Sequence, residues 1–215
     1  MKAYLISGLG ADARIFVNTK LPQQFQPVYI NWIAPEKDES LVAYAKRLSA
    51  VIDPNEPFIL IGLSFGGMIA VEIAKLHPPA ALFLISSIPC IQHLPRLYKV
   101  AGKFGFHRII PIGLFINASL VKRLFTTETR SDKKLLKEMI RDSDPAFIRW
   151  AFHAVLTWNN TDIPGTYIHI HGSDDLLLPL VKNKTTIVVR KGGHLMIVNR
   201  AAEINRILEE QLAAC

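Results

Sequence analysis

Short apolar runs alternate along this chain with longer segments of helical periodicity, and this alternation restricts the possible folds more than any other feature. Six runs rich in Ile, Val, Leu, Phe and Tyr are strand candidates: residues 2–7, 27–32, 58–63, 81–86, 167–171 and 185–190. Strands that alternate with helices form parallel sheets, because parallel neighbours need crossover connections. Several runs are apolar on both faces and need helices on both sides. The sequence therefore predicts an α/β fold with a doubly wound, mostly parallel sheet of six strands.

Two segments outside the strand candidates carry a clear helical stripe. Apolar residues between Leu41 and Ile52 recur at helical spacing after Asp38 and Ser40, either of which can cap the helix. Residues 201–212 place their large apolar side chains on one stripe, so they are predicted to pack on the sheet as the last helix.

Residues 88–160 break the alternation, because they contain several helical pieces and no convincing strand. Two helix starts are indicated, one with Ser131 before Asp132 and one with Asp144 before Pro145 at the first helical position. We therefore predict a core formed by residues 1–87 and 161–215, with a helical insertion at residues 88–160.

The formal net charge of +7 lies wholly in this insertion, which carries twelve Lys and Arg against five Asp and Glu. The basic residues are interleaved with an apolar helical pattern and accompany no nucleic-acid motif, so we expect no nucleic-acid partner. Two interpretations stay open: a solvated basic helical face, and a surface that attracts anionic substrates or membrane lipids.

No membrane span is predicted, and the cysteine content favours a reducing compartment. The longest mostly apolar stretch, residues 109–121, is too short to cross a bilayer. Glycines and Asp12 follow the first apolar run too soon for a signal-peptide core. Cys90 and Cys215 have no spacing typical of a zinc site or a disulfide framework. We therefore expect a cytoplasmic location.

The most specific local motif is Gly-x-Ser-x-Gly at residues 62–66, which directly follows an apolar strand candidate and precedes a helical run. A chain that turns abruptly from strand to helix can hold a serine in a strained conformation, with its hydroxyl above the sheet. Glycine on either side relieves the crowding of such a turn. The motif makes Ser64 a candidate nucleophile, and the alternative is a purely structural glycine-rich turn.

A serine hydroxyl is a poor nucleophile at neutral pH and needs a nearby base that is itself oriented by an acid. Two further loops supply candidates. Asp174 and Asp175 follow one strand candidate, and His194 follows the next. Because the carboxyl ends of parallel strands meet at one edge of a sheet, we expect Ser64, His194 and one of the two aspartates to lie together.

With these motifs the chain resembles the α/β-hydrolase superfamily, in its ester- and peptide-hydrolysing branches, over nearly its whole length. The chain order Ser, Asp, His is the order of that family. In the family the acid lies in a pattern of Gly, two residues, Asp and a proline four positions further on. Gly172, Asp175 and Pro179 fit this pattern, which favours Asp175 over Asp174. The resemblance also implies that residues 2–7 are the family's third strand, that its first two are missing, and that the insertion is a cap above the nucleophile.

The same resemblance implies an oxyanion hole formed by the backbone amides of Leu9 and Phe65. The family's usual His-Gly pair is replaced here by Ser7-Gly8, a departure that concerns the loop rather than the reaction, because backbone donors tolerate side-chain change. A dinucleotide-binding interpretation of the glycines at 8 and 10 fails, because the third glycine of that fingerprint is missing.

His169 and His171 share one face of a strand candidate and, with His194, could be imagined as metal ligands. We favour an interpretation without metal, in which His171 makes hydrogen bonds to a loop and His169 is a polar group inside or beside the core. The predicted chemistry requires neither a metal nor another cofactor.

These residues predict a serine hydrolase that cleaves a carboxylic ester or thioester through an acyl-enzyme on Ser64, with His194 as general base and Asp175 orienting it. The expected partner is a small acyl substrate, apolar or anionic in view of the composition of the insertion. One alternative is a non-catalytic protein that binds a small ligand. Another is a lyase or acyltransferase that uses the same triad. The sequence predicts no oligomeric state.

Overall fold

The computed structural model describes residues 1–104, 129–163, 165–181 and 186–213. Its six strands form one sheet, parallel throughout, in the order β2-β1-β3-β4-β5-β6. The strands are β1 (Lys2–Ile6), β2 (Gln26–Ile30), β3 (Phe58–Leu63), β4 (Ala81–Ile85), β5 (Ile168–Gly172) and β6 (Thr186–Val189). The predicted parallel sheet of six strands is therefore confirmed, and each strand lies within two residues of its expected bounds.

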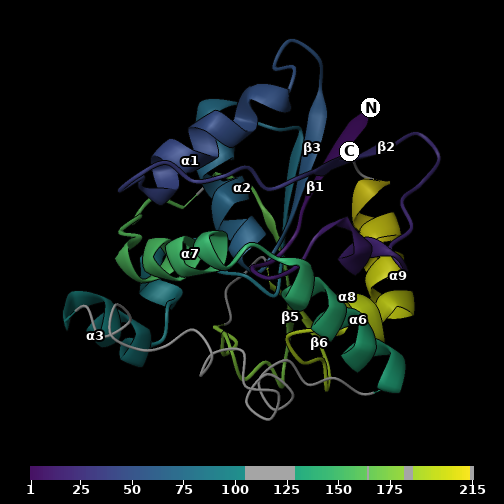
Figure 1. The fold of residues 1–215 in the computed structure, drawn as a ribbon. Helices are drawn as coiled ribbons and strands as arrows, with labels where there is room; N and C mark the ends of the chain where they lie inside the picture. The colour runs from purple at the N-terminus through teal and green to yellow at the C-terminus, as the bar shows by residue number, and fades with distance from the viewer. Residues whose placement is uncertain (105–128, 164, 182–185, 214–215) are drawn as a thin grey trace.

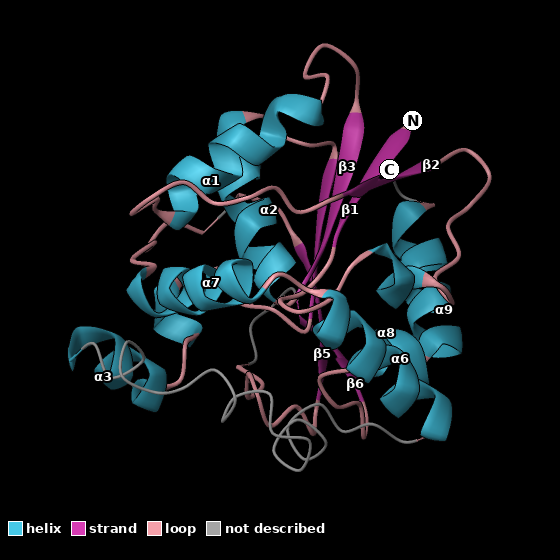
Figure 2. Cartoon of the chain, viewed as in Figure 1, coloured by secondary structure: helices cyan, strands magenta, loops and turns pink. Residues whose placement is uncertain are grey.

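Helices cover both faces of this sheet, as a doubly wound fold requires (Figures 1 and 2). One face is covered by α1 (Leu41–Leu48), α2 (Phe65–Leu76) and α7 (Pro145–Thr157). The other is covered by the 3-10 helix η1 (Ala13–Phe16), α6 (Arg130–Asp142), α8 (Met196–Asn199) and α9 (Ala201–Leu212). The remaining described helices are η2 (Ser49–Val51), η3 (Ile91–His93) and α3 (Arg96–Phe104).

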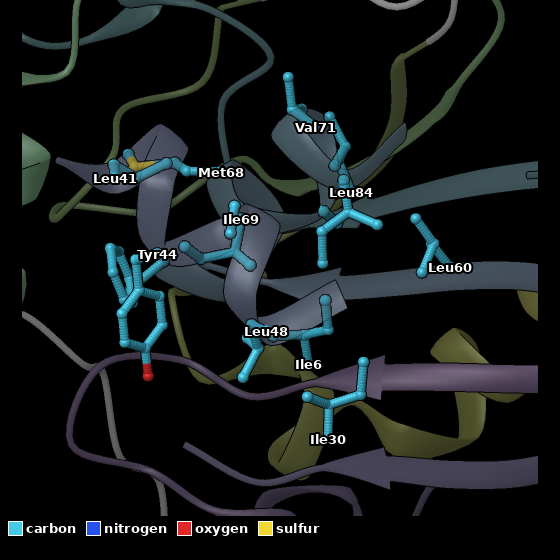
Figure 3. Packing of buried hydrophobic residues seen from close by; sticks show 14 of the residues in the cluster. Ile6, Ile30, Leu41, Tyr44, Leu48, Leu60, Met68, Ile69, Val71 and Leu84 are labelled. Atoms are coloured by element: carbon cyan, nitrogen blue, oxygen red, sulfur yellow. The ribbon is translucent and has the colours of Figure 1, made fainter. Parts of the chain in front are cut away.

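The alternation of side chains along each strand divides the buried residues into two cores. On β3, where all six residues are buried, Leu60 packs with α1 and α2, whereas its neighbour Ile61 packs with the opposite layer. Figure 3 shows the first core, in which Leu48 of α1 lies beside Ile6 of β1. The central strands are thus held in place from both sides, and this fixes the carboxyl-terminal edge from which the site is built.

Two expected helix starts are confirmed by their caps. Ser40 is the residue before α1, and its Oγ accepts a hydrogen bond from the Ala43 N–H at 3.2 Å. Asp144 precedes α7, where its Oδ1 accepts from the Ala146 N–H at 2.8 Å and Pro145 occupies the first helical position.

The expected start of a helix at Ser131 is wrong. Helix α6 begins at Arg130, because Thr129 forms a capping box with Asp132. The Thr129 hydroxyl accepts from the Asp132 N–H at 3.1 Å, and the Asp132 carboxylate accepts from the Thr129 N–H at 3.1 Å. Ser131 therefore lies inside the first turn.

In the described part of the predicted insertion, loops join four helices, η3, α3, α6 and α7, while residues 105–128 lie outside the described ranges. The division into core and insertion stays a prediction. In the described part of the chain, no helix combines the length and the apolar character needed to cross a membrane.

Candidate active site

Ser64 lies in the abrupt turn between β3 and α2, at the carboxyl-terminal edge of the sheet. Its backbone angles are φ 52° and ψ −119°, in the region that non-glycine residues rarely adopt. The turn is held on both sides, because the Ser64 N–H donates to the Ile85 carbonyl at 2.9 Å and its carbonyl accepts from the Gly67 N–H at 2.9 Å. The Ser64 hydroxyl points toward His194, in the loop that follows β6.

Close backbone packing explains the glycines of this turn. A Cβ atom on Gly66 would collide with the carbonyl oxygens of Ile6 and Ser7 at the end of β1. A Cβ atom on Gly62 would collide with the backbone of Gly66 and Gly67. Glycine at these two positions therefore allows α2 to start directly against the sheet.

Three side chains from different loops form a chain of hydrogen bonds at this edge. The Oγ of Ser64 lies 2.9 Å from Nε2 of His194, and Nδ1 of His194 lies 2.8 Å from Oδ2 of Asp175. His194 and Asp175 are each 3% exposed, so the contact between them is shielded from water. Since a carboxylate only accepts, Nδ1 of His194 carries the proton and Nε2 is left free to accept the hydroxyl hydrogen of Ser64.

The turn after β5 holds Asp175 as an anion. Its Oδ1 accepts from the N–H groups of Leu177 at 3.0 Å and Leu178 at 2.9 Å, which leaves Oδ2 for His194. Burial by itself raises the pKa of Asp175, but the charge and hydrogen bond of His194 and the Leu178 N–H outweigh it and lower the pKa below its usual range.

The neighbouring Asp174 lies outside this arrangement. It is exposed, and its Oδ1 accepts a hydrogen bond from the Ser173 hydroxyl at 2.7 Å. The structure thus brings Asp175, and not Asp174, against His194.

The two residues predicted to form the oxyanion hole belong to segments next to Ser64: Leu9 lies in the loop after β1, and Phe65 is the first residue of α2. A Cβ atom on Gly8 would approach the Ser64 Cβ at 3.3 Å, so the loop after β1 runs directly beside the serine. Within the described ranges, neither the Leu9 nor the Phe65 N–H donates a hydrogen bond to another residue. The role of these two amides as an oxyanion hole stays a prediction.

The loop after β1 is held by side chains that converge on one carbonyl. The Ser7 hydroxyl and the Trp32 indole N–H both donate to the Ala11 carbonyl, each at 2.9 Å. The Ala11 N–H in turn donates to the Gly8 carbonyl at 3.1 Å. Ser7, which stands where the resembled family has histidine, therefore stabilises the loop that carries the Leu9 amide.

His169 and His171 are buried and hydrogen-bonded to each other, with Nε2 of His169 lying 3.0 Å from Nδ1 of His171. Nε2 of His171 donates to the Leu178 carbonyl at 2.7 Å, which agrees with the loop contact expected for it. No group of three potential metal ligands is found within the ranges that the structure describes.

Helices of the insertion contact both sides of the site. Phe147 and Trp150 of α7 pack against Phe65 at the start of α2, with ring centroids 6.4 and 6.1 Å away. Tyr98 of α3 donates its hydroxyl hydrogen to the Leu177 carbonyl at 3.1 Å, in the turn that holds Asp175. The predicted insertion therefore contacts both Phe65, next to Ser64, and the turn that holds Asp175.

Ser87 is a residue of the site that the sequence analysis missed. Its hydroxyl donates to the Ser64 carbonyl at 2.6 Å and so supports the strained turn from the end of the neighbouring strand. Its position one residue after Ser86 at the end of a strand candidate was the available signal, but sequence alone does not reveal which carbonyl it reaches.

Comparisons with known proteins agree with this fold. A family model described as the alpha/beta hydrolase family matches residues 5–207. No curated protein sequence matches the chain. Among solved structures, a thermophilic esterase from Thermogutta terrifontis is similar with a TM-score of 0.77 and 16% identity, over 100% of this chain and 90% of that one. MenH from S. aureus has a TM-score of 0.74 and 18% identity, with coverage of 97% and 91%. An esterase from Exiguobacterium antarcticum has a TM-score of 0.73 and 15% identity, with coverage of 97% and 90%.

Proposed function

The chain belongs to the α/β hydrolase family and is a hydrolase of that family, and from this premise we propose that it cleaves carboxylic esters or thioesters through an acyl-enzyme on Ser64. The observation that carries the proposal is the unbroken contact from the Ser64 hydroxyl through His194 to the buried Asp175, with successive distances of 2.9 and 2.8 Å. A serine, a histidine and an aspartate in this order are what nucleophilic acyl transfer requires.

In the first half of the reaction, Ser64 Oγ attacks the carbonyl carbon of the substrate while its proton moves to Nε2 of His194. The imidazolium is stabilised by the Asp175 carboxylate at Nδ1. As the tetrahedral intermediate collapses, His194 returns the proton to the leaving alkoxide or thiolate, and the acyl group stays on Ser64. In the second half, His194 takes a proton from water, whose oxygen attacks the acyl carbonyl carbon. As this second tetrahedral intermediate collapses, the bond to Ser64 Oγ breaks, His194 returns the proton to Oγ, and the carboxylic acid is released.

Negative charge on the carbonyl oxygen needs donors that are already in place. We assign this role to the N–H group of Leu9, in the loop that runs beside Ser64, and to that of Phe65, the next residue in the chain. Among the described residues, neither N–H donates to another acceptor. Because Phe65 is also the first residue of α2, its amide belongs to the positive end of the helix.

For substrate choice, we propose that residues 88–160 act as a cap over the site. Aromatic side chains of α7 lie against Phe65, which favours a substrate with an apolar acyl group. The charge of +7 that the insertion carries favours anionic esters or thioesters. If charge selects the substrate, salt should slow the turnover of an anionic ester more than that of a neutral one, and equal salt dependence would remove this argument.

Turnover of a panel of p-nitrophenyl esters and acyl thioesters of increasing chain length tests the proposal. We expect saturable turnover by the wild-type protein and a loss on the order of 10⁴-fold or more in Ser64→Ala, with the fold retained. An unchanged rate in the purified variant would remove Ser64 from the mechanism. A serine that reacts with a fluorophosphonate but turns over no ester would indicate a lyase or acyltransferase, and a serine that does neither would indicate a ligand-binding protein.

A further inference from the structure

A second histidine, His171, also approaches the Asp175 carboxylate, at the same oxygen Oδ2 that contacts His194. Nε2 of His171 lies 2.7 Å from the Leu178 carbonyl and 3.4 Å from Oδ2 of Asp175, and both side chains are buried. The Leu178 N–H donates to Oδ1 of Asp175. Leu178 is therefore held at its N–H by the acid and at its carbonyl by His171, so the turn that presents Asp175 is fixed at both ends.

The hydrogen-bond partners determine the protonation of His171. A carbonyl oxygen only accepts, so Nε2 of His171 carries a hydrogen and directs it toward Leu178 and Asp175. Nε2 of His169 lies 2.9 Å from the Ser87 carbonyl, so it also carries a hydrogen. Nε2 of His169 and Nδ1 of His171 are 3.0 Å apart. Because Nε2 of His169 already carries a hydrogen, Nδ1 of His171 must be an acceptor. His171 is thus neutral, with its hydrogen on Nε2, and His169 also carries a hydrogen on Nε2.

Burial opposes any second proton on either ring. It lowers the pKa of His169 to about 4 and also lowers the pKa of His171. The ionisable groups that face the pair are Asp175, His194 and, from η3, His93. A charged His171 would in addition direct an Nδ1 hydrogen at the Nε2 hydrogen of His169.

His169 is connected through Ser87 to the turn that contains Ser64. The carbonyl of Ser87 accepts from His169, and the hydroxyl of the same residue donates to the Ser64 carbonyl at 2.6 Å. Nδ1 of His169 lies 3.1 Å from the Thr186 hydroxyl, which can donate to it. Buried hydrogen bonds therefore connect the acid turn with the serine turn by a route that does not pass through His194.

We propose that His171 is a positioning residue for Asp175. We further propose that His169 selects the tautomer of His171 that carries its hydrogen on Nε2 and donates it. The inference rests on the proposed function and adds two residues to it. An N–H directed toward Oδ2 shields part of the carboxylate charge, and the bond to Leu178 holds the turn, so that Oδ2 keeps its geometry toward His194.

Two substitutions of similar chemistry but different reach test this role. In His171→Gln the side-chain amide can place an N–H where Nε2 stands, whereas in His171→Asn it reaches only the position of Nδ1. We expect H171Q to keep most of the wild-type kcat and H171N to lose about 10- to 100-fold, the usual effect of losing a hydrogen bond to a charged group.

The pH profile of kcat/KM separates positioning from mere support of the fold. Without the N–H, the carboxylate charge is less shielded and holds the imidazolium form of the base more strongly. The acidic limb should therefore move to higher pH in H171N and stay in place in H171Q. Equal losses in both variants with an unmoved acidic limb would overturn the inference. Absence of turnover in the wild-type protein would instead overturn the proposed function.

The form of the two rings can be measured in the wild-type protein whether or not the variants fold. Two-bond nitrogen–proton NMR correlations of the histidines should show His169 and His171 neutral at pH 7, with the hydrogen on Nε2 of each. A hydrogen on Nδ1 of His171, or a charged ring, would contradict the inference whatever the activity.

Discussion

The indole N–H of Trp158 donates a 2.7 Å hydrogen bond to Oε1 of Glu72, a carboxylate that is 4% exposed on α2. Lys75 contacts the other oxygen of Glu72 at 3.0 Å and donates to Oδ1 of Asn160 at 2.6 Å. The carbonyl of Asn160 accepts from the Ile91 N–H at 2.8 Å. Both ends of the predicted insertion are thus connected to each other and to α2, the helix that begins directly after Ser64.

Trp158→Phe should lower the free energy of unfolding by about 2 kcal/mol more than Trp150→Phe. Both changes remove one indole N–H, but Trp158 donates to a buried carboxylate, whereas Trp150 donates to the neutral Glu39 carbonyl. Urea unfolding of the two variants measures the difference. Equal losses would mean that the bond to Glu72 does not hold the insertion.

Gly66→Ala should destabilise the protein by about 3 kcal/mol or prevent folding, because the new methyl group meets the backbone of β1 and neither side can move. Gly165→Ala is the matched control, since nothing lies within 4 Å of a Cβ atom there. Thermal unfolding followed by circular dichroism compares the two variants. A Gly66→Ala protein as stable as the control would show that α2 does not start against β1.

Stability should fall between pH 6.5 and about 4 because His169 is buried in its neutral form. Its pKa is lowered from 6.5 to about 4, so over this range the unfolded chain takes up a proton that the folded chain does not. The loss reaches about 3 kcal/mol at the acid end. The lowered pKa of Asp175 acts in the same direction only at lower pH, below its ordinary value of 3.8.

Urea unfolding at several pH values measures this slope in the wild-type protein and in His169→Gln, which has no ionisable group at that position. The slope should be smaller in the variant. A free energy of unfolding that stays constant from pH 6.5 to about 4 in the wild-type protein would contradict the buried neutral state.

The sequence predicted the sheet well because each strand signal is local. A run such as residues 58–63, apolar on both faces, can be buried only inside a covered parallel sheet, and β3 has these bounds. The last helix was likewise predicted at residues 201–212, where α9 is found. The first residue of a helix is harder to predict where two possible capping residues lie close together, as Thr129 and Ser131 do. Which of them accepts the hydrogen bond from the first turn depends on the path of the preceding backbone.

The candidate site was predictable where a motif follows a strand, as for Ser64, Asp175 and His194. The supporting contacts were not, because they join residues that are far apart in sequence and carry no motif. Ser87 reaches the Ser64 carbonyl across 23 positions, and the His169 contact to Ser87 spans 82. Composition and periodicity contain no information on such pairs.

Asp175→Asn should lower kcat/KM by about 10⁴-fold, the cost of presenting the wrong tautomer of the base, while Asp174→Asn changes it little. The two residues are adjacent, but only Asp175 contacts His194, whereas Asp174 is exposed. Steady-state turnover of one ester by both variants measures the difference. A larger loss in Asp174→Asn would assign the acid to the other residue.

Covalent labelling tests the proposed nucleophile most directly. The protein is treated with a fluorophosphonate, digested, and the modified residue is located by mass spectrometry. We predict a single adduct on Ser64 that forms at a strongly reduced rate in His194→Gln, because the hydroxyl then lacks its base. A label on another residue, or labelling of Ser64→Ala as complete as that of the wild-type protein, would contradict the proposed mechanism.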